Sequence, residues 1–150
     1  MKKYTFETKM YISNKTSDGQ GTQNFGYIDF RSGNLYAVNL YTSADATKVN
    51  IQSNVKDANG KSSNVAWMPI GEWFTFKMVT KTYTVNGVKT LDTFFYVNGQ
   101  SVGSQIGVTN FGSSALSTFD ATALNIKLNS GQVIEMYLDD LTFTRTQSED

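Results

Sequence analysis

Apolar and polar side chains alternate along most of this 150-residue sequence. Residues 6–12 show the pattern clearly, because Phe6, Met10 and Ile12 are separated by polar or mixed residues. Side chains two residues apart lie on the same face of a β-strand, so the pattern predicts a half-buried strand. No segment has the 3.6-residue apolar period of a capped helix, and only residues 114–123 suit one short helical turn. The sequence therefore predicts an all-β fold.

Turn residues divide the chain into eight or nine short strands. Asn86-Gly87 and Asn98-Gly99 each suit a tight hairpin, because both residue types tolerate positive φ. Many short strands with frequent turn signals predict a sandwich or a barrel. We expect a single domain over residues 1–146 and a frayed tail at 147–150. The further strands are expected at 25–30, 35–41, 47–52, 73–83, 91–97, 123–128 and 132–144.

Composition excludes several functions. Thirteen basic and thirteen acidic residues cancel, so no overall field favours nucleic acid or an anionic membrane as partner. The chain has no histidine and no cysteine, which removes the usual catalytic triads and the usual zinc ligands. The first residues carry no signal peptide and begin directly in a strand-like run. We therefore expect a domain from a larger, multidomain protein that is extracellular or at the cell surface.

Three segments occur in an order that resembles a known superfamily. They are 71–78 (GEWFTFKM), 94–103 (FFYVNGQSVG) and 137–143 (YLDDLTF). The set resembles the laminin-G/concanavalin-A-like superfamily, in which a G-x-W strand precedes a Y-V-[DN]-G hairpin and a Y-[IL]-D-D-[VIL] strand closes the fold. The resemblance implies a jelly-roll sandwich of two antiparallel sheets, one of them concave. Most members bind glycans or proteins, and some are glycosidases or polysaccharide lyases.

Acidic residues near the C-terminus are the candidates for catalysis or metal binding. Glycosidases on this fold use paired carboxylates spaced E-x-D-x-E or E-x-D-x-x-E. Glu135 and Asp139 come nearest to that pattern, but its third acid is missing. We therefore expect no enzyme activity. Asp139 and Asp140 interrupt the alternation of their strand, which favours a β-bulge, and calcium ligation is the alternative.

Exposed aromatic and amide side chains are the candidates for carbohydrate binding. If Phe95 and Val97 face the core, Tyr96 faces outwards. In the same way, Tyr11 is exposed if Met10 and Ile12 face the core. If Tyr36, Val38 and Leu40 face inwards, Asn39 and Tyr41 face outwards; the opposite phase remains open for that strand.

The two tryptophans are expected to differ. Trp67 lies in an irregular stretch and is either a platform for a sugar ring or a core plug under a loop. Trp73 is expected to be structural, as a plug at the sandwich edge.

The sequence thus predicts a non-catalytic module that binds polysaccharide, with calcium as the one cofactor considered. The alternatives are a protein-binding, adhesive or structural surface domain and, less favoured, a glycosidase or a polysaccharide lyase.

Overall fold

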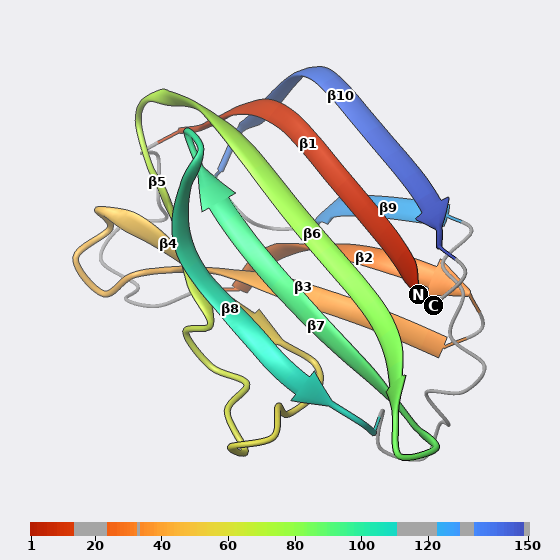
Figure 1. Cartoon of the computed structure of the whole chain (residues 1–150). Helices are drawn as coiled ribbons and strands as arrows, with labels where there is room; N and C mark the ends of the chain where they lie inside the picture. Colours follow the sequence, from red (N-terminus) through yellow and green to blue (C-terminus); the bar gives the residue numbers. More distant parts are fainter. Residues whose placement is uncertain (14–23, 33, 111–122, 130–133, 149–150) are drawn as a thin grey trace.

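The computed structural model describes residues 1–13, 24–32, 34–110, 123–129 and 134–148. The described chain forms two antiparallel five-stranded sheets packed face to face, with no helix (Figure 1). This confirms the predicted all-β jelly-roll sandwich. The predicted helical turn at 114–123 lies almost wholly outside the described residues, as do residues 149–150 of the predicted tail.

The first sheet has the strand order β10-β1-β6-β7-β8, and the second has the order β5-β4-β3-β2-β9. The strands of the first sheet are β10 (Met136–Gln147), β1 (Lys2–Ile12), β6 (Trp73–Val85), β7 (Val88–Val97) and β8 (Gln100–Val108). Those of the second are β5 (Ala66–Pro69), β4 (Lys48–Ser53), β3 (Asn34–Thr42), β2 (Asn24–Ser32) and β9 (Ala123–Leu128).

The core lies between the sheets and takes one side chain from every second residue. Phe6, Phe76 and Phe95 come from neighbouring strands of the first sheet, with ring centroids 6.2 and 6.4 Å apart. Tyr4 contacts Phe30 of the second sheet at 6.1 Å, so aromatic rings join the two layers. Tyr36, Val38 and Leu40 of β3 are also fully buried in this core. Their inward phase is confirmed, and the opposite phase for that strand is wrong.

The two predicted Asn-Gly turns connect β6 to β7 and β7 to β8. Asn86 and Asn98 have φ of 49° and 52°, and Gly87 and Gly99 have φ of 79° and 78°. Asparagine and glycine reach this left-handed region at little cost, so the turns form where the sequence predicts them.

One buried amide ties a long loop to the sandwich. Gln105 of β8 accepts a hydrogen bond from the Tyr36 hydroxyl at 2.8 Å. Its Nε2 donates to the carbonyls of Val55 at 2.7 Å and Lys61 at 3.0 Å. All of these polar atoms are therefore satisfied inside the protein, where an unpaired group is costly.

The last strand carries the predicted bulge. Glu7 pairs with Thr142 and Lys9 pairs with Asp139, so two residues of β10 oppose Thr8 alone. Asp140 is one of those two, and its φ is 51°. The Thr8 hydroxyl donates to the Asp139 carbonyl at 2.9 Å and fills the place where the ladder is interrupted.

The two ends of the described chain meet. β10 extends through Gln147, and the amino group of Met1 donates to the Ser148 carbonyl at 3.2 Å. Over the described ranges, no helix is long and apolar enough to cross a membrane.

Burial of Tyr36 predicts a loss of stability at high pH. Removal from water raises the pKa of its phenol to about 12, above the value near 10 of an unfolded chain. The contribution of Tyr36 is fully present below pH 10 and is lost as the pH rises towards 12, by on the order of 2–3 kcal/mol. Urea unfolding between pH 9 and 12 measures it. Tyr36→Phe should show a smaller alkaline loss, and equal losses in both proteins would contradict the assignment.

Candidate functional site

The antiparallel register arranges the outward side chains of the first sheet in rows. Tyr137, Tyr11 and Trp73 form the row at one end, because Tyr11 pairs with both of the others. The next row contains Asp139, Lys9, Thr75 and Asn98. Further along the same strands come Glu7, Lys77 and Tyr96, then Thr5, Val79 and Phe94, and then Lys3, Lys81 and Asp92.

A cationic hollow, the lysine pocket, lies over the last three of these rows. It has a volume of about 230 Å³ and is lined by Lys3, Lys77, Val79, Lys81, Phe94 and Tyr96. No acidic side chain lines it, and none of its three lysines forms an ion pair with another described residue. The pocket therefore presents three positive charges to a ligand.

Aromatic rings support the lysines of this pocket. The Nζ of Lys77 lies 4.9 Å from the centre of the Tyr96 ring, and that of Lys81 lies 5.5 Å from the centre of the Phe94 ring. Such cation–π contacts hold an ammonium group in place without neutralising its charge. Val79 is only 8% exposed although it faces away from the core, because these long side chains cover it.

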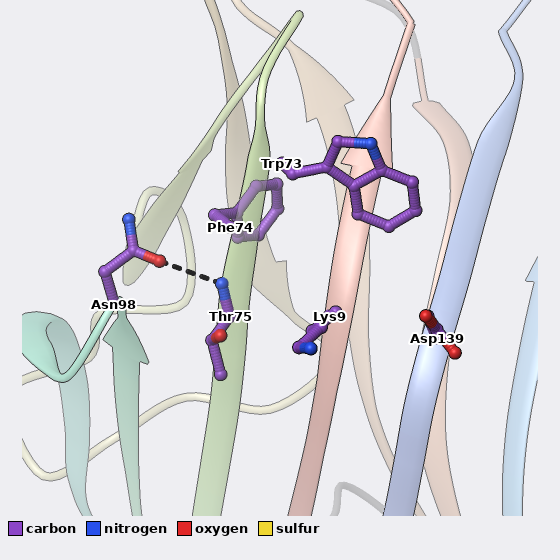
Figure 2. Close-up of a pocket in the computed structure, with 6 residues that line it drawn as sticks. All are labelled: Lys9, Trp73, Phe74, Thr75, Asn98 and Asp139. Carbon is purple, nitrogen blue, oxygen red and sulfur yellow. Dashed lines mark hydrogen bonds between the residues drawn. The ribbon is translucent and has the colours of Figure 1, made fainter.

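A second hollow, the tryptophan pocket, lies at the other end of the same face (Figure 2). Its volume is about 390 Å³, and it is lined by Lys9, Trp73, Phe74, Thr75, Asn98 and Asp139. Asn98 Oδ1 accepts a hydrogen bond from the Thr75 backbone amide at 2.9 Å, which fixes the orientation of its side chain. Figure 2 shows the Trp73 indole extended across the face towards β1.

Three aromatic side chains form a platform beside this pocket. The Tyr11 ring lies 5.7 Å from Trp73 and 6.1 Å from Tyr137, in tilted contacts. Trp73 is 56% exposed and Tyr137 is 49% exposed. The expectation that Trp73 is a structural plug is wrong, because its ring lies on the outer face, whereas the core residues of β6 begin at Phe74 and continue with Phe76 and Met78.

Acidic groups gather at the platform end of the face. Asp140 Oδ2 pairs with Lys9 Nζ at 3.0 Å. The hydrogen bond to Asp140, then the charge of Asp140, raises the pKa of Lys9 above its ordinary value. The Tyr137 hydroxyl donates to Glu135 Oε2 at 2.6 Å, and this bond raises the pKa of Tyr137.

The structure divides the predicted ligand-binding residues between opposite faces of the sandwich. Tyr11 and Tyr96 lie on the outer face of the first sheet. Trp67, Tyr41 and Asn39 lie on the outer face of the second sheet, where Asn50 pairs with both Trp67 and Tyr41. Ligand binding by either group stays a prediction.

Trp67 differs from its two expected settings. It belongs to strand β5 rather than to an irregular stretch, and it is 41% exposed. It is therefore not a core plug.

Asp139 and Asp140 sit at the bulge, where Asp139 Oδ1 accepts a hydrogen bond from the Asp140 amide at 2.9 Å. Among the described residues, no group of three or more acidic side chains is placed to hold a metal ion. Calcium ligation by this pair stays a prediction.

The lysines were missed by the sequence reasoning. Lys77 and Lys81 are four residues apart in one strand, a spacing that places both on one face and was open to detection. Lys3 lies near them only because β1 pairs with β6, and that pairing could not be predicted from the sequence.

No family model matches the chain, and no curated protein matches it. Solved structures match its fold, and two of them are described next. One is a family 18 polysaccharide lyase, aly-SJ02 r-CATD, with a TM-score of 0.52 and 15% identity over 98% of this chain and 73% of the other. The second is the alginate lyase Aly36B, with a TM-score of 0.54 and 14% identity over 95% of this chain and 70% of the other. These matches show the jelly-roll sandwich and fit a concanavalin-A-like fold.

The comparison corrects two predictions. The predictions of a non-catalytic carbohydrate-binding module and of no enzyme activity are both wrong by this comparison. The two proteins that share the fold over nearly the whole chain are lyases. The sequence reasoning considered chemistry that needs histidine, cysteine or a carboxylate pair. Elimination next to a carboxylate can instead use tyrosine and lysine, and this chain holds both on one face.

The Lys9–Asp140 contact can be checked directly. Asp140→Asn removes the negative charge while keeping a residue that tolerates positive φ, so the pKa of Lys9 should fall towards its ordinary value. An NMR titration of the Lys9 side chain measures this. Asp45→Asn, in the β3–β4 turn of the second sheet, is the control and should leave Lys9 unchanged. An unaltered Lys9 pKa in Asp140→Asn would show that the contact does not form.

Proposed function

We propose that this protein is a polysaccharide lyase of the concanavalin-A-like fold and that it acts on an acidic polysaccharide on the outer face of the first sheet. The observation that carries the proposal is the lysine pocket, whose lining combines three lysines that form no ion pair with the phenol of Tyr96. The fold similarity to two polysaccharide lyases supports it. An extracellular or cell-surface location and a polysaccharide partner belong to the same proposal.

A lyase cleaves a uronate polysaccharide by elimination. A base removes the proton on the carbon next to the carboxylate, and the electron pair forms a double bond to the neighbouring ring carbon. The bond from that carbon to the glycosidic oxygen breaks, and the oxygen takes up a proton. Negative charge grows on the carboxylate as the first proton leaves, so the reaction needs fixed positive charge there.

The pocket supplies groups for each of these tasks. Lys3, Lys77 and Lys81 would bind the uronate carboxylate and stabilise its developing charge. The Tyr96 hydroxyl is the proton-transfer group among the lining residues, and Lys77 over its ring holds the ring in place. We assign to Tyr96 the proton transfers and to the lysines the carboxylate.

Glycoside hydrolysis fits this face less well. It requires two carboxyl groups that flank the scissile bond. Three acids of the face are engaged: Asp140 pairs with Lys9, Asp139 accepts from the Asp140 amide, and Asp92 accepts from the Gly107 amide at 2.8 Å. Glu7, which pairs with Lys77 in the register, is then a single carboxylate rather than one of a pair. The lysine pocket itself is lined by none of them.

The test is the ultraviolet absorbance of unsaturated uronate ends, with alginate, polygalacturonate and hyaluronan as substrates. Tyr96→Phe should lower kcat by roughly 100-fold or more, because one proton-transfer group contributes about 10²–10⁴-fold. Lys77→Met and Lys81→Met should lower kcat/KM by roughly 10-fold or more, since each removes a charge aimed at the carboxylate.

Lys48→Met is the matched control, because Lys48 is an exposed lysine of β4 in the second sheet. It should retain full activity. No unsaturated product from any acidic polysaccharide, or equal activity of all four variants, would refute the proposal.

A further inference from the structure

We propose that this protein has a second binding surface, on the outer face of the second sheet, and that its ligand is an uncharged polysaccharide. This goes beyond the lyase function and does not depend on it. The observation that carries it is a pair of neighbouring rows in which aromatic rings and amide side chains lie side by side.

Strand pairing builds the first row. Asn50 of β4 pairs with Trp67 of β5 on one side and with Tyr41 of β3 on the other. Asn24 of β2 continues the row beyond Tyr41. Trp67 and Tyr41 are two strands apart, which corresponds to about 10 Å across the sheet. Two linked sugar rings span such a distance, so one glycan chain that crosses the strands can contact both aromatic rings.

The second row lies beside the first. Asn39 of β3 pairs with Gln52 of β4 and with Tyr27 of β2. Asn39 and Tyr41 are two residues apart in one strand, so the rows are separated by about 7 Å. A sugar ring on the first row can therefore direct its hydroxyl groups to the second.

The amide side chains of both rows are available to a ligand. Asn39, Asn50 and Gln52 are partly buried, and none of their side chains forms a hydrogen bond with another described residue. A partly buried amide needs water or a ligand to satisfy its donors and acceptors. A sugar hydroxyl both donates and accepts, as water does, so it can replace that water without leaving the amide unpaired.

The Tyr41 ring is held in place without a ligand. Asn24 Nδ2 donates a hydrogen bond to the Tyr41 hydroxyl at 3.4 Å. The Oδ1 of Asn24 accepts from the Gly26 amide at 3.2 Å and from Asn129 Nδ2 at 3.3 Å. These bonds tie Tyr41 to β2 and to the end of β9. An aromatic ring that is already ordered loses less entropy when a ligand binds.

The charge of these rows selects the kind of ligand. No side chain from β2 to β5 in either row is charged, and the first cation of the second row is Lys127 of β9, whose Nζ lies 5.9 Å from the centre of the Tyr27 ring. A carboxylate bound between Trp67 and Tyr41 would lose its water without gaining a cation, which is costly. The rows therefore suit an uncharged glycan, in contrast to the lysine pocket on the first sheet.

The exposure of apolar side chains favours a glycan over a protein partner. Among the described side chains of β2, β3, β4 and β5, Trp67 is the only large apolar one that is strongly exposed, at 41%. A stable protein interface has an apolar centre built from several such side chains. A single ring flanked by amides instead matches a sugar, which has an apolar C–H side and a rim of hydroxyls.

Affinity electrophoresis through gels that contain hydroxyethylcellulose, arabinoxylan or galactomannan tests the proposal. At least one of these uncharged polymers should retard the protein. Trp67→Ala should weaken that binding by roughly 10-fold or more, because loss of one aromatic ring beneath a stacked ligand costs about this much. Asn50→Ala should weaken it by roughly threefold or more, since it removes a hydrogen-bonding group between the two rings.

Trp73→Ala is the matched control, because Trp73 is the other exposed tryptophan and lies on the first sheet. It should retain the full affinity for the uncharged polymer. Failure of all three polymers to retard the wild-type protein, or an equal loss in the two tryptophan variants, would overturn the proposal.

Fluorescence places the ligand without removing Trp67. Trp73→Phe leaves Trp67 as the single tryptophan, so its emission reports contact on the second sheet alone. Cellohexaose, xylohexaose or mannohexaose should change that emission, and a galacturonate hexamer should not. No change with any of the uncharged oligosaccharides, or a larger change with the galacturonate, would also contradict the second surface.

These outcomes are separate from those of the proposed function, because polymers without uronate cannot undergo the elimination. Retardation by an uncharged polymer without unsaturated product from any acidic polysaccharide would refute only the lyase function. Unsaturated product without retardation would refute only the second surface.

Discussion

The burial of every second side chain of β1, β6 and β7 is the constraint on which the rest of the molecule depends. Phe6, Phe76 and Phe95 lie side by side in the core and fix the register of three neighbouring strands. A slip of one residue would send each ring to the solvent and bring Glu7, Lys77 and Tyr96 inside in their place. The core therefore also determines the pattern on the outer face, because the two sets of side chains alternate along the same backbone.

The candidate site is a direct consequence of this register. Lys3 is 74 residues from Lys77 along the chain, and only the pairing of β1 with β6 brings it close to Lys77 and Lys81. Their charges then act at one place, although the protein as a whole has no net charge. Local field rather than total charge decides what such a face binds. The other end of the face differs, because the bulge at Asp140 brings a carboxylate to Lys9. The charge of Lys9, the fourth lysine of this face, is therefore paired.

Much of the fold was accessible from the sequence. Alternation predicted the strand phases of β1 and β7 but left that of β3 open. Turn chemistry predicted both Asn-Gly hairpins, and the interrupted pattern at Asp139-Asp140 predicted the bulge. These features are local, and each depends on residues that are neighbours in the chain. Trp67 shows the limit: its strand β5 is only four residues long, and it forms by pairing with β4 rather than by its own pattern.

The site was less accessible for the same physical reason. The sequence could place single residues such as Tyr11 and Tyr96 on an outer face, but it could not tell which of the two outer faces each one occupies. In the structure Tyr11 and Tyr96 share the outer face of the first sheet, and Tyr41 lies on that of the second. Trp73 was expected inside because large aromatic residues are commonly buried, whereas its position in the alternation of β6 exposes it. The function was misjudged because the missing histidine and cysteine were taken as evidence against chemistry, while tyrosine and lysine were not considered together.

The central claim is that the outer face of the first sheet is the functional surface, and an NMR titration tests it most directly. Backbone amide shifts would be recorded while a purified uronate-containing oligosaccharide is added to the Tyr96→Phe protein. We predict that the shifts concentrate in β1, β6 and β7 around Lys77 and Trp73. Shifts that concentrate in β3, β4 and β5 around Trp67 and Tyr41 would contradict the account.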